Sequence, residues 1–504
     1  FVSENNRTMQ YTKRLASLLV LCAALLSINV FAQRDTNYRP KFHFTPPAKW
    51  MNDPNGMFYA NGVYHLFYQH NPEAAVWGPM HWGHATSKDL IRWQHQPIAL
   101  YPDSLGMIFS GSAVVDSMNT SGFGKHGQIP IVAIYTYHDD QAEKAGSASF
   151  QHQALAYSLD NGITWTKYSG NPVLRSPGIR DFRDPKVIWH RHTKQWIMAL
   201  AVQDHIEFYA SKNLKEWHKL SEFGKTMGAH GGVWECPDLF PMEHAGRTHW
   251  VLLVNLNPGG PNKGSATQYF VGSFNGQDFQ PYDTITRWLD YGPDEYAGVT
   301  WSNTGKERIF IGWMSNWSYA NIVPTTTWRS AMTIPRNLAL KQVQGRWYVA
   351  NTPVQNLLQY ADKPVDLLPS FKKGKPIMLN RNTFQLDIAA SAKQDWQISL
   401  SSAANDTLLI GYDAGKQLFY LDRGKTGETA FHQDFPIKAI APRFVQTGQT
   451  EIQLIFDQAS VELFADDGLT SMTQIFFPHA PLQKLHIHQQ GITAVKKMQV
   501  RYFK

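Results

Sequence analysis

Three acidic residues share one local pattern in this sequence: each stands one or two positions before a proline that leads into an apolar run. The three are Asp53 before Pro54, Asp184 before Pro185, and Glu235 before Cys236 and Pro237. Proline fixes φ and offers no N–H, so it constrains the backbone directly after each carboxylate. A single such site is an ordinary turn, but its threefold recurrence points to carboxylates placed for acid–base or nucleophilic chemistry.

The surroundings of Asp53 indicate a short β-element. Asn55-Gly56 and Asn61-Gly62 are turn-forming dipeptides, and the apolar runs 57–59 and 63–68 follow them. This order is typical of strand, turn and strand, with Asp53 at the lip of the element.

Cleavage of a glycosidic bond is one reaction that such residues perform. It needs one carboxylic acid to protonate the leaving oxygen and one carboxylate at the anomeric carbon. The sequence gives no distance between the three carboxylates, so it indicates only that they converge if their strands meet in one pocket. The 17 tryptophans fit stacking on sugar rings as well as packing in a β-sheet core.

Metal, phosphate and serine chemistry are less well supported. The close histidine pairs are His81 with His84, His190 with His192, and His486 with His488. None has a Cys, Asp or Glu at a spacing that completes a zinc ligand set. A Gly-rich phosphate loop and a serine nucleophile elbow are absent from the sequence. We therefore predict no metal and no cofactor.

Internal repeats predict the architecture. Four segments begin with Ser, continue with Asp or Asn, and reach an aromatic residue six or seven positions later; they cover residues 87–93, 158–165, 211–217 and 273–279. Each closes a set of short strand-like runs, which is typical of propeller blades. A fifth unit follows from Tyr296, so we predict a five-bladed β-propeller over residues 38–355. The first strand of each blade would then bring the three acids to one central channel.

The remainder of the chain predicts a second β-domain. Residues 356–381 are expected to form a linker. From 382 to 504, apolar and polar residues alternate over many short runs separated by turns, which favours a β-sandwich. The predicted fold class is all-β, a propeller followed by a C-terminal sandwich. We expect the sandwich to support the propeller, since its aromatic residues mostly alternate into a core.

The N-terminal residues predict export. Lys13 and Arg14 precede an apolar run over residues 15–30, so residues 1–32 are expected to comprise upstream residues and a secretory signal cleaved after Ala32. A periplasmic or extracellular protein with Cys236 as its one remaining cysteine would have no internal disulfide. No other run is long and apolar enough to span a bilayer. The absence of long Lys/Arg runs makes nucleic acid a poor partner.

The motifs, taken together and in order, resemble those of glycoside hydrolase family 32, the β-fructosidases. Residues 50–56 resemble the nucleophile motif of the family, 183–185 its transition-state-stabiliser motif and 235–237 its acid/base motif. Segments 68–72, 77–84 and 109–113 are similar to its substrate-pocket segments, and 456–464 is similar to its C-terminal signature. Residues 291–298 depart from the commoner pattern, with Glu295 and Gly298, which leaves the outer substrate contacts open.

The resemblance implies roles for individual residues. Asp53 would attack C2 of a terminal fructosyl unit, Glu235 would act as acid and base, and Asp184 would hold ring hydroxyls. The expected substrate-binding residues are Trp50, Met51, Asn52, Gln69, Trp77, Phe109, Ser110, Arg183, Asp294 and Trp313. Plain core packing for Trp77 and Trp313, and a structural hydrogen bond for Gln69, are the alternatives.

Several functions remain open on the sequence alone. The leading hypothesis is an exo-acting enzyme that releases fructose from levan or inulin, and secondarily from sucrose. An endo-levanase of the same family, an inverting five-bladed glycosidase acting on arabinan or xylan, and a non-catalytic glycan-binding propeller are the alternatives. Linkage preference and oligomeric state are not determined.

Overall fold

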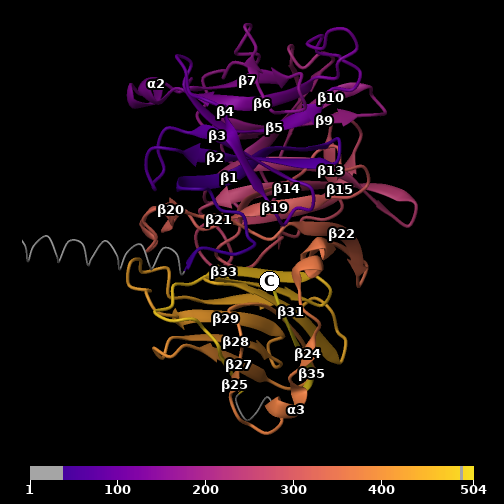
Figure 1. Cartoon of the computed structure of the whole chain (residues 1–504). Helices are drawn as coiled ribbons and strands as arrows, with labels where there is room; N and C mark the ends of the chain where they lie inside the picture. Colours follow the sequence, from indigo (N-terminus) through magenta and orange to yellow (C-terminus); the bar gives the residue numbers. More distant parts are fainter. Residues whose placement is uncertain (1–37, 488–491) are drawn as a thin grey trace, which may run out of the picture.

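Seven β-sheets make up the described chain, five in the upper body of Figure 1 and two in the lower body. The structure is a computed structural model and describes residues 38–487 and 492–504. The predicted secretory signal at 1–32 lies outside these residues. The helices among the described residues are short: α2 (Asp140–Lys144), α3 (Leu368–Phe371), η1 (Ala320–Ile322) and η2 (Gln355–Tyr360). The predicted all-β fold class is confirmed.

The five upper sheets are the blades of a propeller. Blade 1 contains β1 (Lys49–Ala60), β2 (Val63–Asn71), β3 (His81–Ser87), β4 (Gln94–Leu100) and β20 (Trp328–Arg329); blade 2 contains β5 (Met107–Val115), β6 (Ile131–His138), β7 (Gln151–Ser158) and β8 (Thr166–Lys167); blade 3 contains β9 (Phe182–His190), β10 (Gln195–Val202), β11 (His205–Ser211) and β12 (His218–Phe223). Blade 4 contains β13 (Val233–His244), β14 (Arg247–Asn257), β15 (Ala266–Phe274), β16 (Phe279–Pro281) and β17 (Arg287–Trp288); blade 5 contains β18 (Tyr296–Thr300), β19 (Ile309–Met314), β21 (Ala331–Met332), β22 (Arg336–Val343) and β23 (Arg346–Pro353).

The first strands of the blades form a closed ring. β1 contacts β5, β5 contacts β9, β9 contacts β13, β13 contacts β18, and β18 contacts β1. β20, which follows β19 in the chain, pairs in parallel with β1 of blade 1 and so links the last blade to the first. The start of each inner strand therefore faces a shared channel, as the sequence predicted.

The repeated Ser motifs are turns within the blades. In blade 1 the Ser87 hydroxyl accepts from the backbone N–H of Leu90 at 2.8 Å, and the Trp93 indole donates to the Leu90 carbonyl at 3.1 Å. Leu90 has a positive φ of 69°. The indoles of Trp165 and Trp217 donate in the same way to the carbonyls of Gly162 and Leu214. The same type of hydrogen-bonded turn thus connects the third and fourth strands of blades 1 to 3.

The two lower sheets form the sandwich. The first has the order β24 (Val365–Asp366), β35 (Val495–Tyr502), β26 (Thr383–Ser391), β31 (Gln449–Asp457), β32 (Ser460–Ala465) and β33 (Thr470–Ile475); the second has the order β25 (Ile377–Met378), β34 (Lys484–Ile487), β27 (Trp396–Ser401), β28 (Thr407–Asp413), β29 (Leu418–Lys425) and β30 (Lys438–Pro442). One apolar cluster fills the space between them. β24 and β25 come from the segment expected to be a linker, so part of 356–381 belongs to the sandwich.

Buried charges connect the propeller to the sandwich. Arg336 of β22 donates to Asp290 at 2.9 Å and to Glu462 of β32 at 3.1 Å. Glu462 also contacts a ring nitrogen of His43 at 2.7 Å, and the other ring nitrogen contacts Asp457 at 2.9 Å. The side chains of Arg336, Glu462 and His43 are fully buried. None of the helices within the described ranges has the length and apolar character that a membrane crossing requires.

Candidate active site

Each inner strand is interrupted at the point where it carries a candidate site residue. The pairing register shifts between Met51 and Pro54 in β1, between Ile108 and Gly111 in β5, and between Glu235 and Asp238 in β13. The β9–β10 and β18–β19 ladders shift in the same way beside Asp184 and Tyr296. A bulge leaves residues outside the ladder and redirects their side chains. The interruptions therefore turn the site residues toward the channel.

Pro185 and Pro237 lie within these bulges, and Pro54 borders the bulge in β1. A bulge is one of the few places where a strand tolerates a residue without an N–H. Asp184 and Cys236, which precede Pro185 and Pro237, have positive φ values of 64° and 43°. Such backbone angles are costly for non-glycine residues and persist where the surrounding structure enforces them. The carboxylate-and-proline pattern is thus the sequence signature of a bulge that presents an acid.

Asp53 is held by two side-chain donors. Asn52 donates to one carboxylate oxygen at 2.9 Å, and Ser110 of β5 donates to the other at 2.7 Å. Burial and the nearby charge of Glu235 raise the pKa of Asp53, while the hydrogen bonds from Asn52 and Ser110 lower it. The Trp50 indole in turn donates to the Asn52 side-chain oxygen at 2.7 Å and fixes its orientation.

Arg183 joins the other two acids. Its guanidinium nitrogens lie 3.1 and 3.2 Å from one oxygen of Glu235, and its Nε lies 3.9 Å from Asp184. Burial raises the pKa of Asp184 to about 7, helped by the charges of Glu235 and Asp53 and opposed by Arg183. Three carboxylates and one guanidinium from three blades therefore share one electrostatic site.

Two neighbours of the acids were not predicted from the sequence. The Tyr296 hydroxyl of β18 donates to the second oxygen of Glu235. The Cys236 thiol lies 3.5 Å from Asp53 and 3.6 Å from Asp184, so it touches both aspartates. Burial, followed by the charges of the three acids, raises the pKa of Cys236, which keeps it a neutral thiol. The position of Tyr296 at the start of the fifth inner strand is the signal that could have identified it.

The mouth of the site is aromatic. Trp77 is 39% exposed and meets Phe109 edge to face at 6.2 Å between ring centroids. His138 stacks on Phe109 at 4.2 Å. Gln69 is 2% exposed and its amide nitrogen has no hydrogen-bond partner among the described residues, which leaves a donor for a bound molecule. These positions suit the predicted contacts of Trp77, Phe109 and Gln69.

Four predicted substrate contacts are fully buried. Trp50, Met51 and Trp313 have no exposed surface; Trp313 lies behind the site and its indole donates to the Met51 carbonyl at 3.1 Å. These three support the site from behind, and their contact with substrate stays a prediction. The prediction for Asp294 is wrong, since this fully buried carboxylate accepts from Tyr319 and pairs with Arg423 at the sandwich interface.

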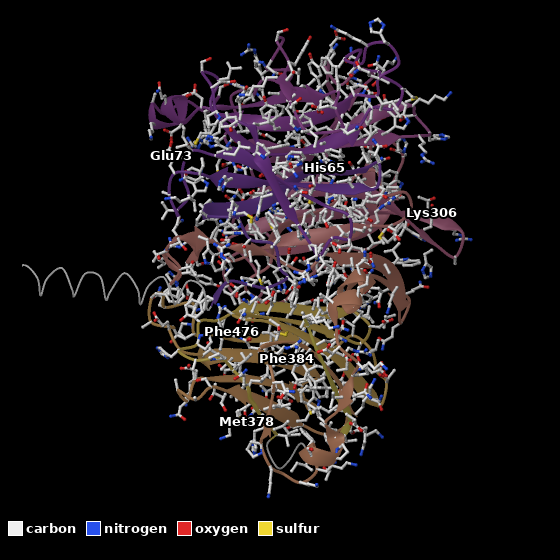
Figure 2. All side chains as sticks on the ribbon, viewed as in Figure 1. His65, Glu73, Lys306, Met378, Phe384 and Phe476 are labelled. Carbon is white, nitrogen blue, oxygen red and sulfur yellow. The ribbon has the colours of Figure 1, made fainter. Side chains whose placement is uncertain are left out.

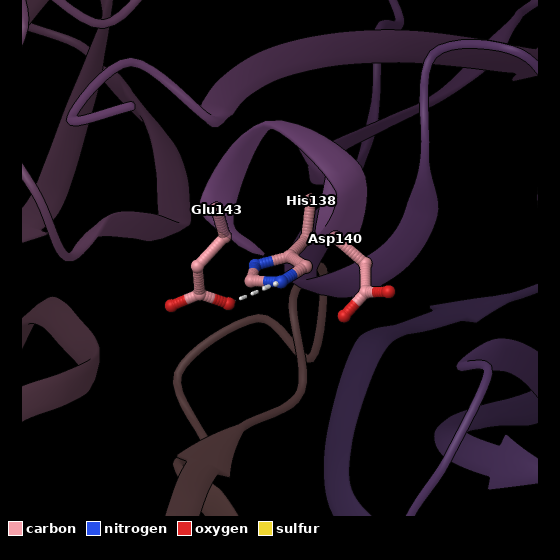
Figure 3. Close-up of side chains that lie close together, drawn as sticks. All are labelled: His138, Asp140 and Glu143. Carbon is pink, nitrogen blue, oxygen red and sulfur yellow. Dashed lines mark ion pairs between the residues drawn. The ribbon is translucent and has the colours of Figure 1, made fainter. Parts of the chain in front are cut away.

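One cluster near the mouth has the residue types of a metal site. His138, Asp140 and Glu143 bring ligand atoms within 4.8 Å of one another. Figure 3 shows the three side chains close together. The potential ligand atoms of these residues already contact other protein groups, however. Glu143 contacts His138 at 3.1 Å and Arg180 at 2.9 Å, and Asp140 pairs with Lys144. The Gln151 amide also lies 3.1 Å from the other His138 nitrogen. The arrangement fits an ion-pair network behind Phe109 better than a resident metal.

A five-bladed propeller gathers three carboxylates at one end of its channel, and paired carboxylates are what the cleavage of a glycosidic bond requires. Comparison with known families agrees. Residues 43–352 match the glycosyl hydrolases family 32 N-terminal domain, and residues 356–502 match the glycosyl hydrolases family 32 C-terminal domain. The chain belongs to glycoside hydrolase family 32.

Individual relatives cover most of the chain. It is 42% identical to a levanase of Bacillus subtilis (strain 168), over 98% of this chain and 75% of the relative. It is 40% identical to an extracellular exo-inulinase of Aspergillus ficuum, over 92% of this chain and 94% of the relative. The crystal structure of exo-inulinase from Aspergillus awamori superposes with a TM-score of 0.84 at 36% identity, covering 93% of this chain and 98% of that one. The chain is thus a family 32 glycosidase that is similar over most of its length to a levanase and to exo-inulinases.

Proposed function

We propose that this chain is an exported, retaining exo-β-fructosidase that removes terminal fructose units from fructans and, secondarily, cleaves sucrose. The observation that carries the proposal is the convergence of Asp53, Asp184 and Glu235, with Arg183, at the bulged starts of three inner strands. The expected substrate contacts Asn52, Gln69 and Ser110 border this group. The similarity to a levanase and to exo-inulinases supports the substrate class.

The reaction has two steps. In the first, Asp53 forms a bond to C2 of the terminal fructosyl unit while the bond from C2 to the glycosidic oxygen breaks, and Glu235 gives its proton to that oxygen. In the second, Glu235 takes a proton from water, the water oxygen bonds to C2, and the bond between C2 and Asp53 breaks. Two inversions at C2 leave its configuration retained.

Asp184 and Arg183 stabilise the charged state between these steps. Asp184 accepts hydrogen bonds from ring hydroxyls, and those bonds strengthen as positive charge develops on the ring. Arg183 opposes the rise in the pKa of Asp184 that burial causes, and so favours the ionised form. Tyr296 donates to Glu235 and orients the carboxyl for proton transfer.

The burial of the sugar-binding side chains favours exo over endo attack. Asn52, Ser110 and Asp184 are only 3%, 4% and 5% exposed. An internal unit of a polymer needs an open groove, whereas a terminal unit enters a narrow pocket. The backbone N–H of Trp77 donates to Asn321 at 2.8 Å, and Arg329 donates to the Ala75 carbonyl at 2.8 Å, so two loops are tied together at the rim.

Product analysis tests the proposal. The purified chain is incubated with levan, inulin and sucrose, and early products are separated by chromatography. Fructose as the sole product of levan and inulin is expected, with rates that rank the β-2,6 and β-2,1 linkages. A ladder of oligosaccharides would instead indicate an endo-levanase, and no release from any of the three would overturn the assignment.

A further inference from the structure

The far ends of the inner strands enclose a second and larger cavity. It has a volume of about 1500 Å³ and is lined by residues from the ends of β5, β9, β13 and β18 and from the adjoining strands of blades 3 and 4. The three acids stand near the starts of the inner strands β1, β9 and β13, so the cavity lies at the opposite mouth of the channel. We call it the distal groove. It shares none of the predicted catalytic or substrate-binding residues.

Figure 2 labels one residue from the region of each mouth, and the two labels lie on opposite sides of the propeller. Glu73 belongs to the loop that carries Trp77 at the first mouth, and its label lies at the left of the upper body. Lys306 lines the distal groove, and its label lies at the right of the same body. A ligand in the distal groove would therefore leave the active site free.

The floor of the distal groove carries an unused acceptor. Asp238 is fully buried, and one of its oxygens accepts from Lys186 at 3.1 Å and from the Thr300 hydroxyl at 2.7 Å. Its other oxygen has no hydrogen-bond partner among the described residues. A buried carboxylate oxygen without a partner is costly, so the floor is suited to a hydroxyl group of a ligand or of a bridging water.

The walls of the distal groove are aromatic and partly exposed. Trp189 of β9 and Trp250 of β14 are half-buried and both line the cavity. Trp189 packs edge to face on Trp196 at 5.0 Å, and Trp250 packs edge to face on Phe274 at 5.3 Å. These contacts hold the two indoles in place. Rigid indoles beside hydroxyl and amide groups are suited to stacking on sugar rings while hydroxyls are hydrogen-bonded.

The charges at the floor of the distal groove do not favour an anion. Arg308 donates from Nε and Nη1 to the carbonyls of Pro241, Gly305 and Glu307, which occupies part of its guanidinium. The Lys186 ammonium is neutralised by Asp238. Glu243, together with the free oxygen of Asp238, would repel a carboxylate or phosphate. The exposed cations, Arg191 and Lys306, lie at the rim rather than at the floor.

We propose that the distal groove is a second carbohydrate-binding site, which holds a neutral oligosaccharide chain away from the catalytic mouth. Trp189 and Trp250 stack on sugar rings, and the floor at Asp238 accepts from a hydroxyl group. The site goes beyond the proposed function, since it requires neither hydrolysis nor any of the three acids. Its effect is to keep the enzyme on a polymeric glycan.

Affinity electrophoresis of the full chain tests the groove. The background is Glu235→Gln, which removes turnover, and the gel contains long-chain inulin plus excess sucrose to fill the first pocket. Retardation by inulin should persist, and Trp189→Ala or Trp250→Ala should raise the dissociation constant about two- to tenfold. Trp347→Ala, a half-buried tryptophan outside the groove, is the matched control. Sucrose hydrolysis in the otherwise native chain should not change with either groove substitution.

Substitutions at two exposed residues keep the test decisive if a tryptophan variant fails to fold. Met118 lines the groove and is 57% exposed, so Met118→Glu should weaken retardation without unfolding the chain. Lys306→Glu should leave retardation unchanged. Equal retardation of the parent and of the Trp189, Trp250 and Met118 variants would overturn the proposal. So would no retardation of the parent, or a loss in Lys306→Glu as large as the loss in the tryptophan variants. Hydrolysis of inulin by the native chain is measured separately, so failure of the proposed function would be recognised independently.

Discussion

At the residue scale, the site depends on keeping Asp53 ionised beside a second acid. Burial and Glu235 raise its pKa, and donors from Asn52 and Ser110 oppose this rise. The Ser110 hydroxyl at 2.7 Å is the contact that a single substitution removes most cleanly. The hydrogen bonds from Asn52 and Ser110 thus determine whether Asp53, the proposed nucleophile, is ionised at neutral pH.

Ser110→Ala should therefore raise the pKa of Asp53 and move the acidic limb of the kcat/KM profile to higher pH. A hydrogen bond to a charged group contributes about 1.5–3 kcal/mol, so kcat should fall about 10- to 100-fold. The pH–rate profile on sucrose is the measurement. Ser112→Ala is the control, since this hydroxyl on the same strand donates to the Pro185 carbonyl and touches none of the acids. Equal limb shifts in both variants would contradict the assignment.

Arg183 has a similar role for Asp184, whose pKa of about 7 it holds down. Arg183→Gln should let that pKa rise, so that Asp184 is protonated at neutral pH. Activity should then fall more steeply at pH 6 than at pH 8, and the acidic limb should move up by about one unit or more. A uniform loss at every pH would show that Arg183 acts only by holding substrate.

At the scale of the elements, the bulged inner strands present the site residues, and the interface between propeller and sandwich holds buried charge pairs. The prolines predicted strands directly after the three acids, whereas β1, β9 and β13 begin before the acids and are interrupted beside them. The residue pattern accompanies each bulge, but the register of a bulge depends on the partner strand, which the pattern does not specify. Asp294 shows the same limit: the family resemblance implied a substrate contact, yet its partner is Arg423, far along the chain in the sandwich.

Asp294→Asn should accordingly affect stability and leave substrate binding unchanged. Removing one charge of a buried pair costs about 3–5 kcal/mol, because Arg423 remains buried and unpaired. Chemical denaturation measures the loss, and the KM for sucrose should match that of the parent. Asp467→Asn is the control, since Asp467 is 81% exposed and its pair with Lys341 should contribute about 0–1 kcal/mol. A large rise in KM would restore Asp294 as a substrate contact.

At the scale of the whole molecule, two buried groups between propeller and sandwich make stability depend on pH. Burial lowers the pKa of His43, but hydrogen bonds to Asp457 and Glu462 outweigh this and raise it to about 9. Burial, with the charge of Asp290, raises the pKa of Glu295 to about 8. Through these two groups, the folded protein binds more protons than the unfolded chain between about pH 4.5 and 9.

Stability should fall as pH rises from about 6.5 to 9. The stabilising charge of His43 is fully present below its unfolded pKa and is lost through about 9, while Glu295 must ionise in a buried site through about 8. Glu295→Gln removes the second contribution, so its melting temperature should decline less over this range. Scanning calorimetry between pH 6 and 9.5 tests this. Parallel curves for parent and variant would contradict it.

Residues near this interface also show which contacts could not be predicted from the sequence. Alternation and the repeated turns predicted the fold class and both domains, since those patterns are local. The contacts of Glu295, packed against Gly298 and Gly312, could not be predicted, because they depend on how distant strands meet. The sequence identified Glu295 only as a departure from the common pattern of its family.

The stereochemistry of fructosyl transfer tests the central claim most directly. The chain is incubated with sucrose in the presence of methanol, and the methyl fructofuranoside is identified by NMR, since this product does not interconvert between anomers in neutral water. Attack by Asp53 followed by methanol predicts the β-anomer, with its formation lost in Asp53→Ala. Exclusive formation of the α-anomer would show a single displacement and contradict the proposed role of Asp53.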